Sequence, residues 1–437
     1  MQTLKKQDQF LVGLTLFSMF FGAGNLIFPP LLGAQSGTSI WLALLGFAIS
    51  AVGLPVLGVI AVAKSGGLPN LAMRVGKHFS WWFSLLIYLS IGPGLAIPRT
   101  ASTSFEMAVT PFFPEIGSWG IVAYSAVFFI VAMLVSFRPE KLTDRLGKIL
   151  APTLLVLIGV IVVGCVLNPP ASFSAPTGSY TSGVLAQGFV DGYLTMDTIA
   201  ALNYGIVIAL NIQNRGISDS SSIVKGTVRA GWIAGVVLVV LYSVLGYVGA
   251  VTGPAMEQYH NGANILSYLV RFLYGAPGSI LLGLVFIIAC LNSCIGLFSS
   301  CSEYFYKLFP RISYRGWVVI FGIISFGISI LGLDAILTIS IPVLNVLYPL
   351  SIVLIAMGLT HSVWEKAPIC YPVTILVTGA FSVVYALNLA GLSLPVVGQA
   401  LTKMPLYQEG LCWLLPAVLA CLVGFIVSKL KPVSSKH

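Results

Sequence analysis

Two glycines and an asparagine interrupt the first long apolar segment of this chain. The run Gly22 to Asn25 lies inside residues 10–32, which are otherwise mostly apolar. Glycine has weak helix propensity, so the run predicts a helix break with unpaired carbonyl groups on one side and unpaired amide groups on the other. In hydrocarbon such groups are costly, and a break persists only where protein, water or a ligand fills it. The run is a candidate binding site, although glycines also serve close helix packing. We expect the helix to end at Pro29–Pro30.

Composition places that run inside a membrane. Of the 437 residues, 57% are hydrophobic and only 8% are charged, whereas about a quarter of an average soluble domain is charged. Apolar segments long enough to cross a bilayer, about 17 to 25 residues each, recur along the chain. The sequence predicts twelve transmembrane helices, at residues 10–32, 40–63, 81–109, 117–135, 149–167, 188–212, 230–251, 279–301, 317–331, 335–359, 371–389 and 410–427.

The basic residues give these helices an orientation. Nearly all of the 22 Lys and Arg residues fall in the termini and in the connections on the N-terminal side of the membrane, the exceptions being Arg99, Arg271 and Lys403. Connections rich in Lys and Arg face the cytoplasm, so we expect both termini to be cytoplasmic. The formal charge of +9 then reflects topology and contact with anionic lipid, and we expect no nucleic acid partner.

A second interruption lies in the sixth segment. Residues 191–198 are polar and include a glycine, and an apolar helix resumes after them. With five helices per unit, the first helix corresponds to the sixth, and matched interruptions are typical of inverted-repeat transporters. The predicted fold is all-α and integral to the membrane, one transport domain over 1–437. It contains a first repeat at 10–167, a second at 188–359 and two additional helices at 371–427.

Two opposite charges lie at membrane depth in the third segment. Arg99 and Glu106 are seven residues apart, so they share one helix face and are separated by about 10 Å along the axis. One Glu near one Arg is a common way for a membrane bundle to neutralise both groups. We therefore predict a structural charge pair and not a charge relay.

Short motifs are spread over the whole chain: FGAGNLIFPP at 21–30, GP at 92–93, PRTA at 98–101, SFE at 104–106, GYLTMDT at 192–198, GL at 296–297 and EYF at 303–305. Together they resemble those of the branched-chain amino acid carriers of the BrnQ type, in the amino acid, polyamine and organocation superfamily. The resemblance implies a LeuT-like five-plus-five inverted repeat with helices one and six discontinuous. It also implies a bacterial inner-membrane protein that imports leucine, isoleucine and valine with sodium.

The substrate is expected at the two interruptions, at Gly22, Ala23, Gly24, Asn25, Tyr193, Leu194, Thr195 and Asp197. Amide groups of the first run open the outer half of helix one, and the positive end of a helix dipole suits a carboxylate. By the resemblance, carbonyl groups of the second run help to bind the ammonium group. Asp197 has two interpretations: a functional acid, or an acceptor of backbone hydrogen bonds that holds the broken helix.

A sodium site follows from the same resemblance. Its ligands are the carbonyl groups of Ser18, Phe21 and Ala289 and the side chains of Asn292 and Ser293. All five donors are oxygen atoms, as a hard cation requires. Asn292 departs from the Thr or Ser often found there, so Ser293 is the firmer ligand. The alternative is that both side chains bond between helices.

Other mechanisms make different demands on the sequence. Proton coupling would use Asp197, Glu106 or another buried acid as the carrier, in place of the oxygen-rich set on helices one and eight. A membrane-embedded enzyme is disfavoured because no paired acids, His-Glu-x-x-His or Gly-x-Ser-x-Gly motif lies at membrane depth. A channel is disfavoured because no charged ring or repeated pore loop is present.

Overall fold

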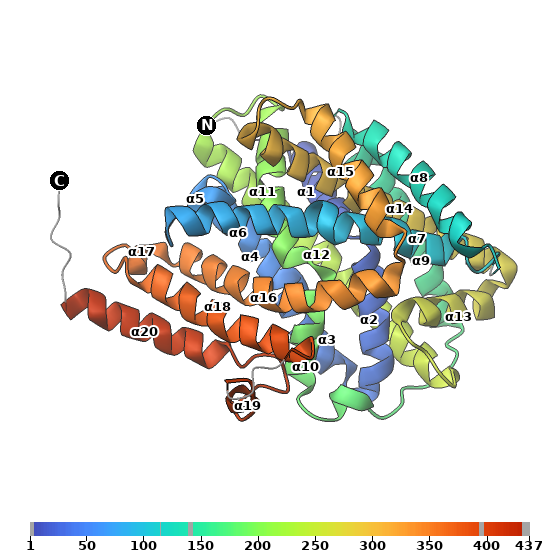
Figure 1. Cartoon of the computed structure of the whole chain (residues 1–437). Helices are drawn as coiled ribbons and strands as arrows, with labels where there is room; N and C mark the ends of the chain where they lie inside the picture. The colour runs from blue at the N-terminus through green and yellow to red at the C-terminus, as the bar shows by residue number, and fades with distance from the viewer. Residues whose placement is uncertain (1–3, 114, 139–142, 393–396, 431–437) are drawn as a thin grey trace.

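The computed structural model describes residues 4–113, 115–138, 143–392 and 397–430, and this part of the chain is all-helical (Figure 1). The helices are α1 (Lys6–Phe20), α2 (Ala23–Ser36), α3 (Ile40–Ala48), α4 (Leu54–Ser65), α5 (Leu68–Met73), α6 (Lys77–Leu89), α7 (Ala96–Ala108), α8 (Gly117–Ser136), α9 (Ala151–Leu167), α10 (Val184–Asp191), α11 (Asp197–Gln213), α12 (Ser220–Thr252), α13 (Gly262–Tyr274), α14 (Ala276–Leu308), α15 (Tyr314–Ser329), α16 (Leu333–Leu359), α17 (His361–Trp364), α18 (Cys370–Leu389), α19 (Val397–Thr402) and α20 (Leu414–Leu430).

Each predicted transmembrane segment has helical counterparts among the described residues. By length and hydropathy, eight helical stretches are able to cross a membrane, or nine if the bent pair α10–α11 is one span. One stretch, Ala23–Ser65, is 43 residues long and joins the outer half of helix one to the whole of helix two, while α15 and α20 are shorter apolar helices. The count of twelve therefore stays a prediction.

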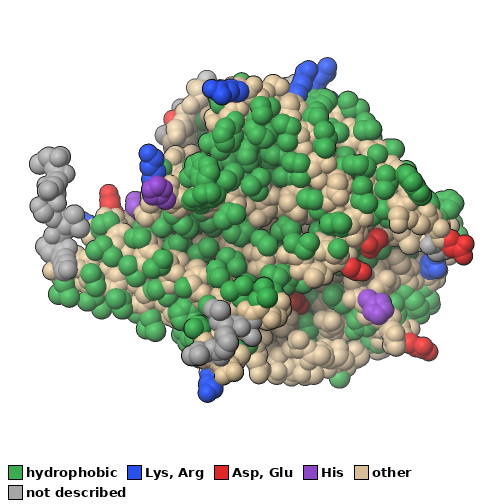
Figure 2. Space-filling view, in the orientation of Figure 1, with side chains coloured by type: hydrophobic (Ala, Val, Ile, Leu, Met, Phe, Trp, Pro, Cys, Tyr) green, Lys and Arg blue, Asp and Glu red, His purple; other side chains and the backbone are tan. Residues whose placement is uncertain are grey.

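The exterior of the protein carries many exposed hydrophobic side chains. Hydrophobic side chains cover much of the face in Figure 2. Leu376, Ile323 and Leu419 are more than half exposed, as expected where hydrocarbon replaces water as the solvent. In Figure 1, α6 and α7 form a long rod across the front, and α16, α18 and α20 lie in successive layers beneath it.

Helix one is broken at the predicted position, beside Gly22. The chain leaves α1 at Phe21, passes through extended backbone at Gly22 (φ −129°, ψ −154°) and enters α2 at Ala23. The helix does not end at Pro29–Pro30, because α2 contains both prolines and continues to Ser36. Packing explains why the helix continues through the prolines. Gly249 of α12 lies directly against the Pro30 carbonyl, so a neighbouring helix supports the turn that proline weakens.

Helix six is broken at the matching place. Between α10 and α11 the chain forms a short 3-10 turn (Gly192–Thr195), then Met196 adopts a left-handed conformation with φ 67°. The two halves are bent by 47°. Because α11 begins at Asp197, a carboxylate lies at the positive end of its dipole, where a negative charge is stabilised.

Helix three carries a further break, between α6 and α7. Residues Ser90–Gly94 form a wide π turn in which Gly92 is non-helical (φ −81°, ψ −124°). A Cβ at Gly92 would be 3.0 Å from the Cys301 sulfur of α14, so a glycine is what lets the bend approach helix eight. The break aims the first turn of α7 at the centre of the bundle.

Candidate functional site

The three breaks meet at one buried cavity of about 40 Å³. Its walls come from the end of α1, the start of α2, the bend between α6 and α7, the start of α11 and the middle of α14. The lining residues are Met19, Phe20, Gly22, Ala23, Gly24, Asn25, Ile91, Ala96, Arg99, Thr100, Thr195, Met196, Asp197, Ala200, Tyr204, Ser293 and Leu297. One buried water needs roughly 10–15 Å³ of such space, so the cavity has room for about three.

Asn25 joins the two broken helices. Its Oδ1 accepts a hydrogen bond from the Gly22 N–H (3.0 Å), and its Nδ2 donates to Asp197 Oδ2 (2.6 Å) and to the Tyr242 hydroxyl. All of these groups are buried, where an unmade hydrogen bond is expensive. The Asn25 side chain is thus occupied by protein partners.

Asp197 is held by side chains. Its Oδ2 accepts from Asn25 and from the Tyr242 hydroxyl (3.0 Å), and its own N–H donates to Thr195 Oγ1 (3.4 Å). The residue is 2% exposed and lines the cavity. These contacts join α11 to α2 and α12, so the carboxylate links three elements and also faces the cavity.

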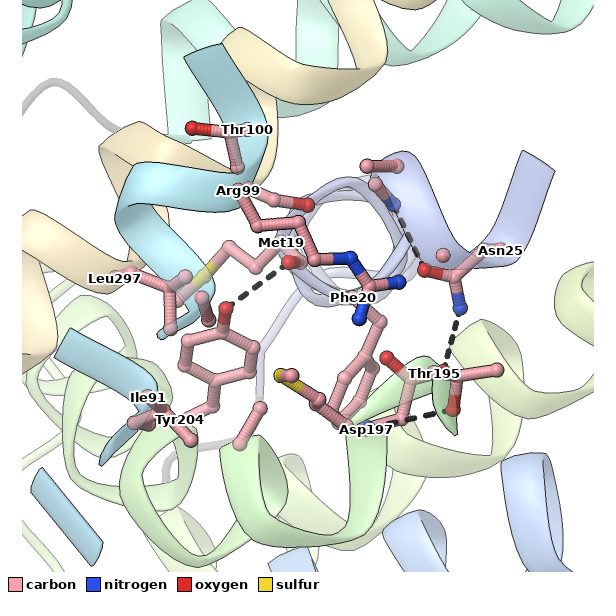
Figure 3. A pocket seen from close by; sticks show the side chains of 17 residues that line it. Met19, Phe20, Asn25, Ile91, Arg99, Thr100, Thr195, Asp197, Tyr204 and Leu297 are labelled. Carbon is pink, nitrogen blue, oxygen red and sulfur yellow. Dashed lines mark hydrogen bonds between the residues drawn. The ribbon is translucent and has the colours of Figure 1, made fainter. Parts of the chain in front are cut away.

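The predicted Arg99–Glu106 charge pair is not made among the described residues. Arg99 is in the first turn of α7 and points into the cavity (Figure 3), where its Nη1 donates to the Leu194 carbonyl at 3.0 Å. Glu106 lies farther along α7 and faces the start of α16 at Leu333 and Asp334. Both residues lie on α7, after the bend and about 10 Å apart along the helix axis. Arg99 instead donates to a carbonyl that the break in helix six leaves free.

The second interruption contributes unequally to the site. Thr195 and Asp197 line the cavity, as do all four residues of the first run, whereas Tyr193 and Leu194 do not. Tyr193 stacks on Tyr348 of α16, with ring centroids 4.4 Å apart. The Leu194 carbonyl, expected to face an ammonium group, instead accepts from Arg99.

Of the predicted cation ligands, Ser18 and Phe21 lie at the end of α1, and Ser293 of α14 lies at the break itself. Ser293 touches Gly22 and lines the cavity, and its hydroxyl has no hydrogen-bond partner among the described residues. Both polar atoms of the fully buried Asn292 are also without a partner there. Since the Gly22 N–H donates to Asn25, the Ser18 carbonyl loses the N–H that a continuous helix would supply. Unmatched buried oxygens of this kind fit a sodium ligand set.

Sequence reasoning missed two tyrosines near the cavity. Tyr204 of α11 donates to the Met19 carbonyl (3.1 Å) and packs against the Phe20 ring, so it caps the end of α1. Tyr242 of α12 completes the contacts of Asp197. Such residues are scattered in otherwise ordinary apolar helices, and no local pattern distinguishes them from core aromatics.

Two larger cavities open on the side of the N-terminus. They have volumes of about 610 and 360 Å³ and share Gly66, Gly67, Ile206 and Lys307; we refer to them as the inner vestibule. Tyr88 and Tyr304 line it and stack with their ring centroids 3.8 Å apart. The cavity at the helix breaks begins about one or two helical turns along the chain from these rings, at Ile91 and Leu297.

The fold matches solved transporters. The chain aligns with Mhp1, a nucleobase-cation-symport-1 family transporter in a closed conformation with bromovinylhydantoin bound, with a TM-score of 0.61 and 15% identity, over 98% of this chain and 94% of that one. It also aligns with MhsT in complex with L-phenylalanine, with a TM-score of 0.57 and 17% identity, over 98% and 99% of the two chains. The shared feature is the LeuT-like fold.

Sequence comparisons are more specific. The chain is 38% identical to the branched-chain amino acid permease BrnQ of Bacillus subtilis (96% of each protein) and 40% identical to the branched-chain amino acid transport system 3 carrier protein of Pseudomonas aeruginosa (98% of each). Residues 5–431 match the family described as branched-chain amino acid transport protein. These relatives are transport proteins and not enzymes. Because that match and those identities extend over nearly the whole chain, the protein belongs to the branched-chain amino acid transport protein family.

Proposed function

We propose that this protein imports leucine, isoleucine and valine by symport with sodium through alternating access. The observation that carries the proposal is the cavity where helices one and six are both broken, since it combines free helix ends, one acid, one base and an apolar wall. Broken helices at this depth are the usual substrate sites of such transporters. The names of the relatives supply the substrate class.

The polar groups of the substrate need charged or hydrogen-bonding partners, whereas its branched side chain needs an apolar surface. The N–H groups at the start of α2 suit the carboxylate, and Asp197 together with the carbonyls at the end of α1 suits the ammonium group. Ile91, Leu297 and Met19 offer an apolar wall for the branched chain. The three substrates differ by at most a methylene and its branching, worth about 1–3 kcal/mol of discrimination, so one site accepts them all.

Movement is needed to admit such a substrate, because the cavity of about 40 Å³ is smaller than an amino acid. In the proposed cycle, helices one and six rock against helices three and eight. The Asp8–Arg215 ion pair ties α1 to the turn after α11, and the hydrogen bond from Gln9 Nε2 to the Gly226 carbonyl (2.9 Å) ties it to α12. Both contacts support these helices moving together. Sodium at the seam between Gly22 and Ser293 would favour the outward-open state.

The membrane and the orientation belong to the same proposal. The protein would lie in the bacterial inner membrane with both termini in the cytoplasm, since positive connections stay inside. Two repeats at 10–167 and 188–359 and two further helices at 371–427 would form its transport unit.

Uptake of labelled leucine into proteoliposomes tests the proposal. We expect uptake to require an inward sodium gradient, and Ser293→Ala to raise the half-saturating sodium concentration at least about 10-fold. Ser243→Ala is the matched control, because Ser243 bonds only within α12, to the Val239 carbonyl, and should leave that concentration unchanged. Sodium-independent uptake, or an equal effect of both substitutions, would rule out the proposed cation site.

Proton coupling is the second candidate, favoured by the burial of the Asp197 carboxylate inside the cavity. It predicts leucine uptake driven by a pH gradient without sodium, and loss of that dependence in Asp197→Asn. Sodium-driven uptake that ignores the pH gradient would exclude it.

A further inference from the structure

We propose that Arg99 binds the α-carboxylate of the transported amino acid and makes the site selective for zwitterions. The inference rests on the proposed function, because it assigns a ligand-binding role within that same site. Arg99 is only 4% exposed, and the carboxylate expected to neutralise it, Glu106, is not its partner. A buried guanidinium requires an anion, and the geometry points to one that arrives with the substrate.

The contacts of Arg99 position the guanidinium without neutralising it. Nη1 donates to the Leu194 carbonyl (3.0 Å), and the guanidinium carbon lies 5.3 Å from the centre of the Phe28 ring. Of the five N–H donors in the planar fork, this hydrogen bond uses one. Asp197, the acid of the cavity, already accepts from Asn25 and Tyr242 and forms no ion pair with Arg99 among the described residues.

Other donors converge at the same place. Arg99 Nη2 is in contact with Gly24 in the first turn of α2, where the N–H groups of Ala23 and Gly24 have no intrahelical acceptor. Ser293, 7% exposed and with its hydroxyl unpartnered, touches the neighbouring Gly22. A guanidinium edge beside helix-end amides forms a donor set that matches the two oxygens of a carboxylate.

The charges of the cavity complete the argument. Arg99 and Asp197 are the charged residues among those that line it, so the wall carries one positive and one negative group. An amino acid zwitterion, aligned with its carboxylate to Arg99 and its ammonium to Asp197, leaves neither unpaired. A neutral carboxamide in place of the carboxylate would instead present N–H donors to N–H donors, which is a repulsive arrangement.

The test compares leucine with leucinamide, its near-isosteric amide, by binding to the purified full chain in sodium at about pH 6, where both amines are protonated. We expect the wild type to prefer leucine at least about 100-fold. Arg99→Gln should bring the two affinities within about 3-fold of one another, and Arg99→Lys should lower the preference at least about 10-fold, because the fork is lost and the charge is kept. Arg271→Gln, in α13 and outside the cavity, should keep the full preference.

The ratio of leucine to leucinamide affinity distinguishes an arginine that binds the carboxylate from one that only shapes the cavity. If Arg99→Gln weakens both compounds equally and keeps the wild-type preference, the proposal is overturned. Should Arg99→Gln lose its thermal unfolding transition, Arg99→Lys decides, and an unchanged preference in that variant overturns the proposal. A wild type that binds neither compound would overturn the proposed function itself, whereas leucine binding with unchanged ratios rejects the role of Arg99 alone.

Discussion

Single hydrogen bonds hold the interrupted helices in register. Asn25 reaches from α2 to Asp197 of α11, and Tyr242 of α12 meets both side chains. Each group is buried in a part of the membrane where water is scarce, so a lost partner leaves a donor or acceptor unsatisfied. The geometry of the cavity therefore depends on residues that lie beside it as well as on those that line it.

Tyr242→Phe tests that dependence. Removing the hydroxyl leaves Asp197 with one donor fewer, at a cost of about 1–3 kcal/mol, so we expect leucine affinity to fall about 10-fold or more while the protein stays folded. Tyr247→Phe on the same helix is the control, since the Tyr247 ring packs on Phe173 away from the cavity. Equal leucine affinities for the two variants and the wild type would contradict the role given to Tyr242. Binding isotherms with labelled leucine provide the measurement.

Among the elements, α2 and α12 are closely packed beside the site. Gly33 of α2 lies against the Gly246 carbonyl, and Gly249 of α12 lies against the Pro30 carbonyl. Small residues at such crossings allow the backbones to approach, which is the main source of helix association in lipid. The pair carries the outer half of helix one, so its packing fixes where the amide groups of the site point.

Gly249→Ala should weaken this pair. The added methyl group would meet Pro30 backbone atoms and separate the helices, and we expect the free energy of unfolding to fall by about 1–3 kcal/mol. Gly159→Ala in α9 is the matched control: a Cβ there meets nothing within 4 Å, so the same change should be neutral or stabilising by up to about 1 kcal/mol. Thermal unfolding of the purified variants measures both, and a Gly249→Ala variant as stable as the control would refute the packing argument.

At the level of the whole molecule, the inner vestibule gives the proposed cycle a direction. It lies at the ends of α4 and α14, next to connections rich in Lys and Arg. The Tyr88–Tyr304 stack lines it on the way to the proposed substrate cavity. If the termini are cytoplasmic, as we propose, substrate released past these rings would enter the cell.

Cysteine labelling checks that orientation. Asn70→Cys in the vestibule should react with a membrane-impermeant maleimide in inside-out vesicles only, and Asn168→Cys, exposed beyond the end of α9, in right-side-out vesicles only. Background labelling should be low, because six of the native cysteines are buried and Cys421 is partly so. The reverse pattern would place the termini outside.

Much of this protein follows from the sequence alone. The apolar segments require a membrane, because no other solvent accepts so many. The breaks at Gly22 to Asn25 and before Asp197 follow from residues that cannot continue a helix in hydrocarbon. These are local properties of the backbone and its solvent, so they can be predicted without a structure. The family resemblance added the substrate class, which the names of the relatives support.

Tertiary structure alone decided which groups meet. Arg99 donates to the Leu194 carbonyl of helix six and not to Glu106 of its own helix, and packing on α12 carries α2 through Pro29–Pro30. Tyr204 and Tyr242 join the site from helices that have no distinguishing local pattern. Such pairings depend on how elements distant in sequence cross, because close packing and unsatisfied polar groups at the crossing select the partner. Helical periodicity does not encode that selection.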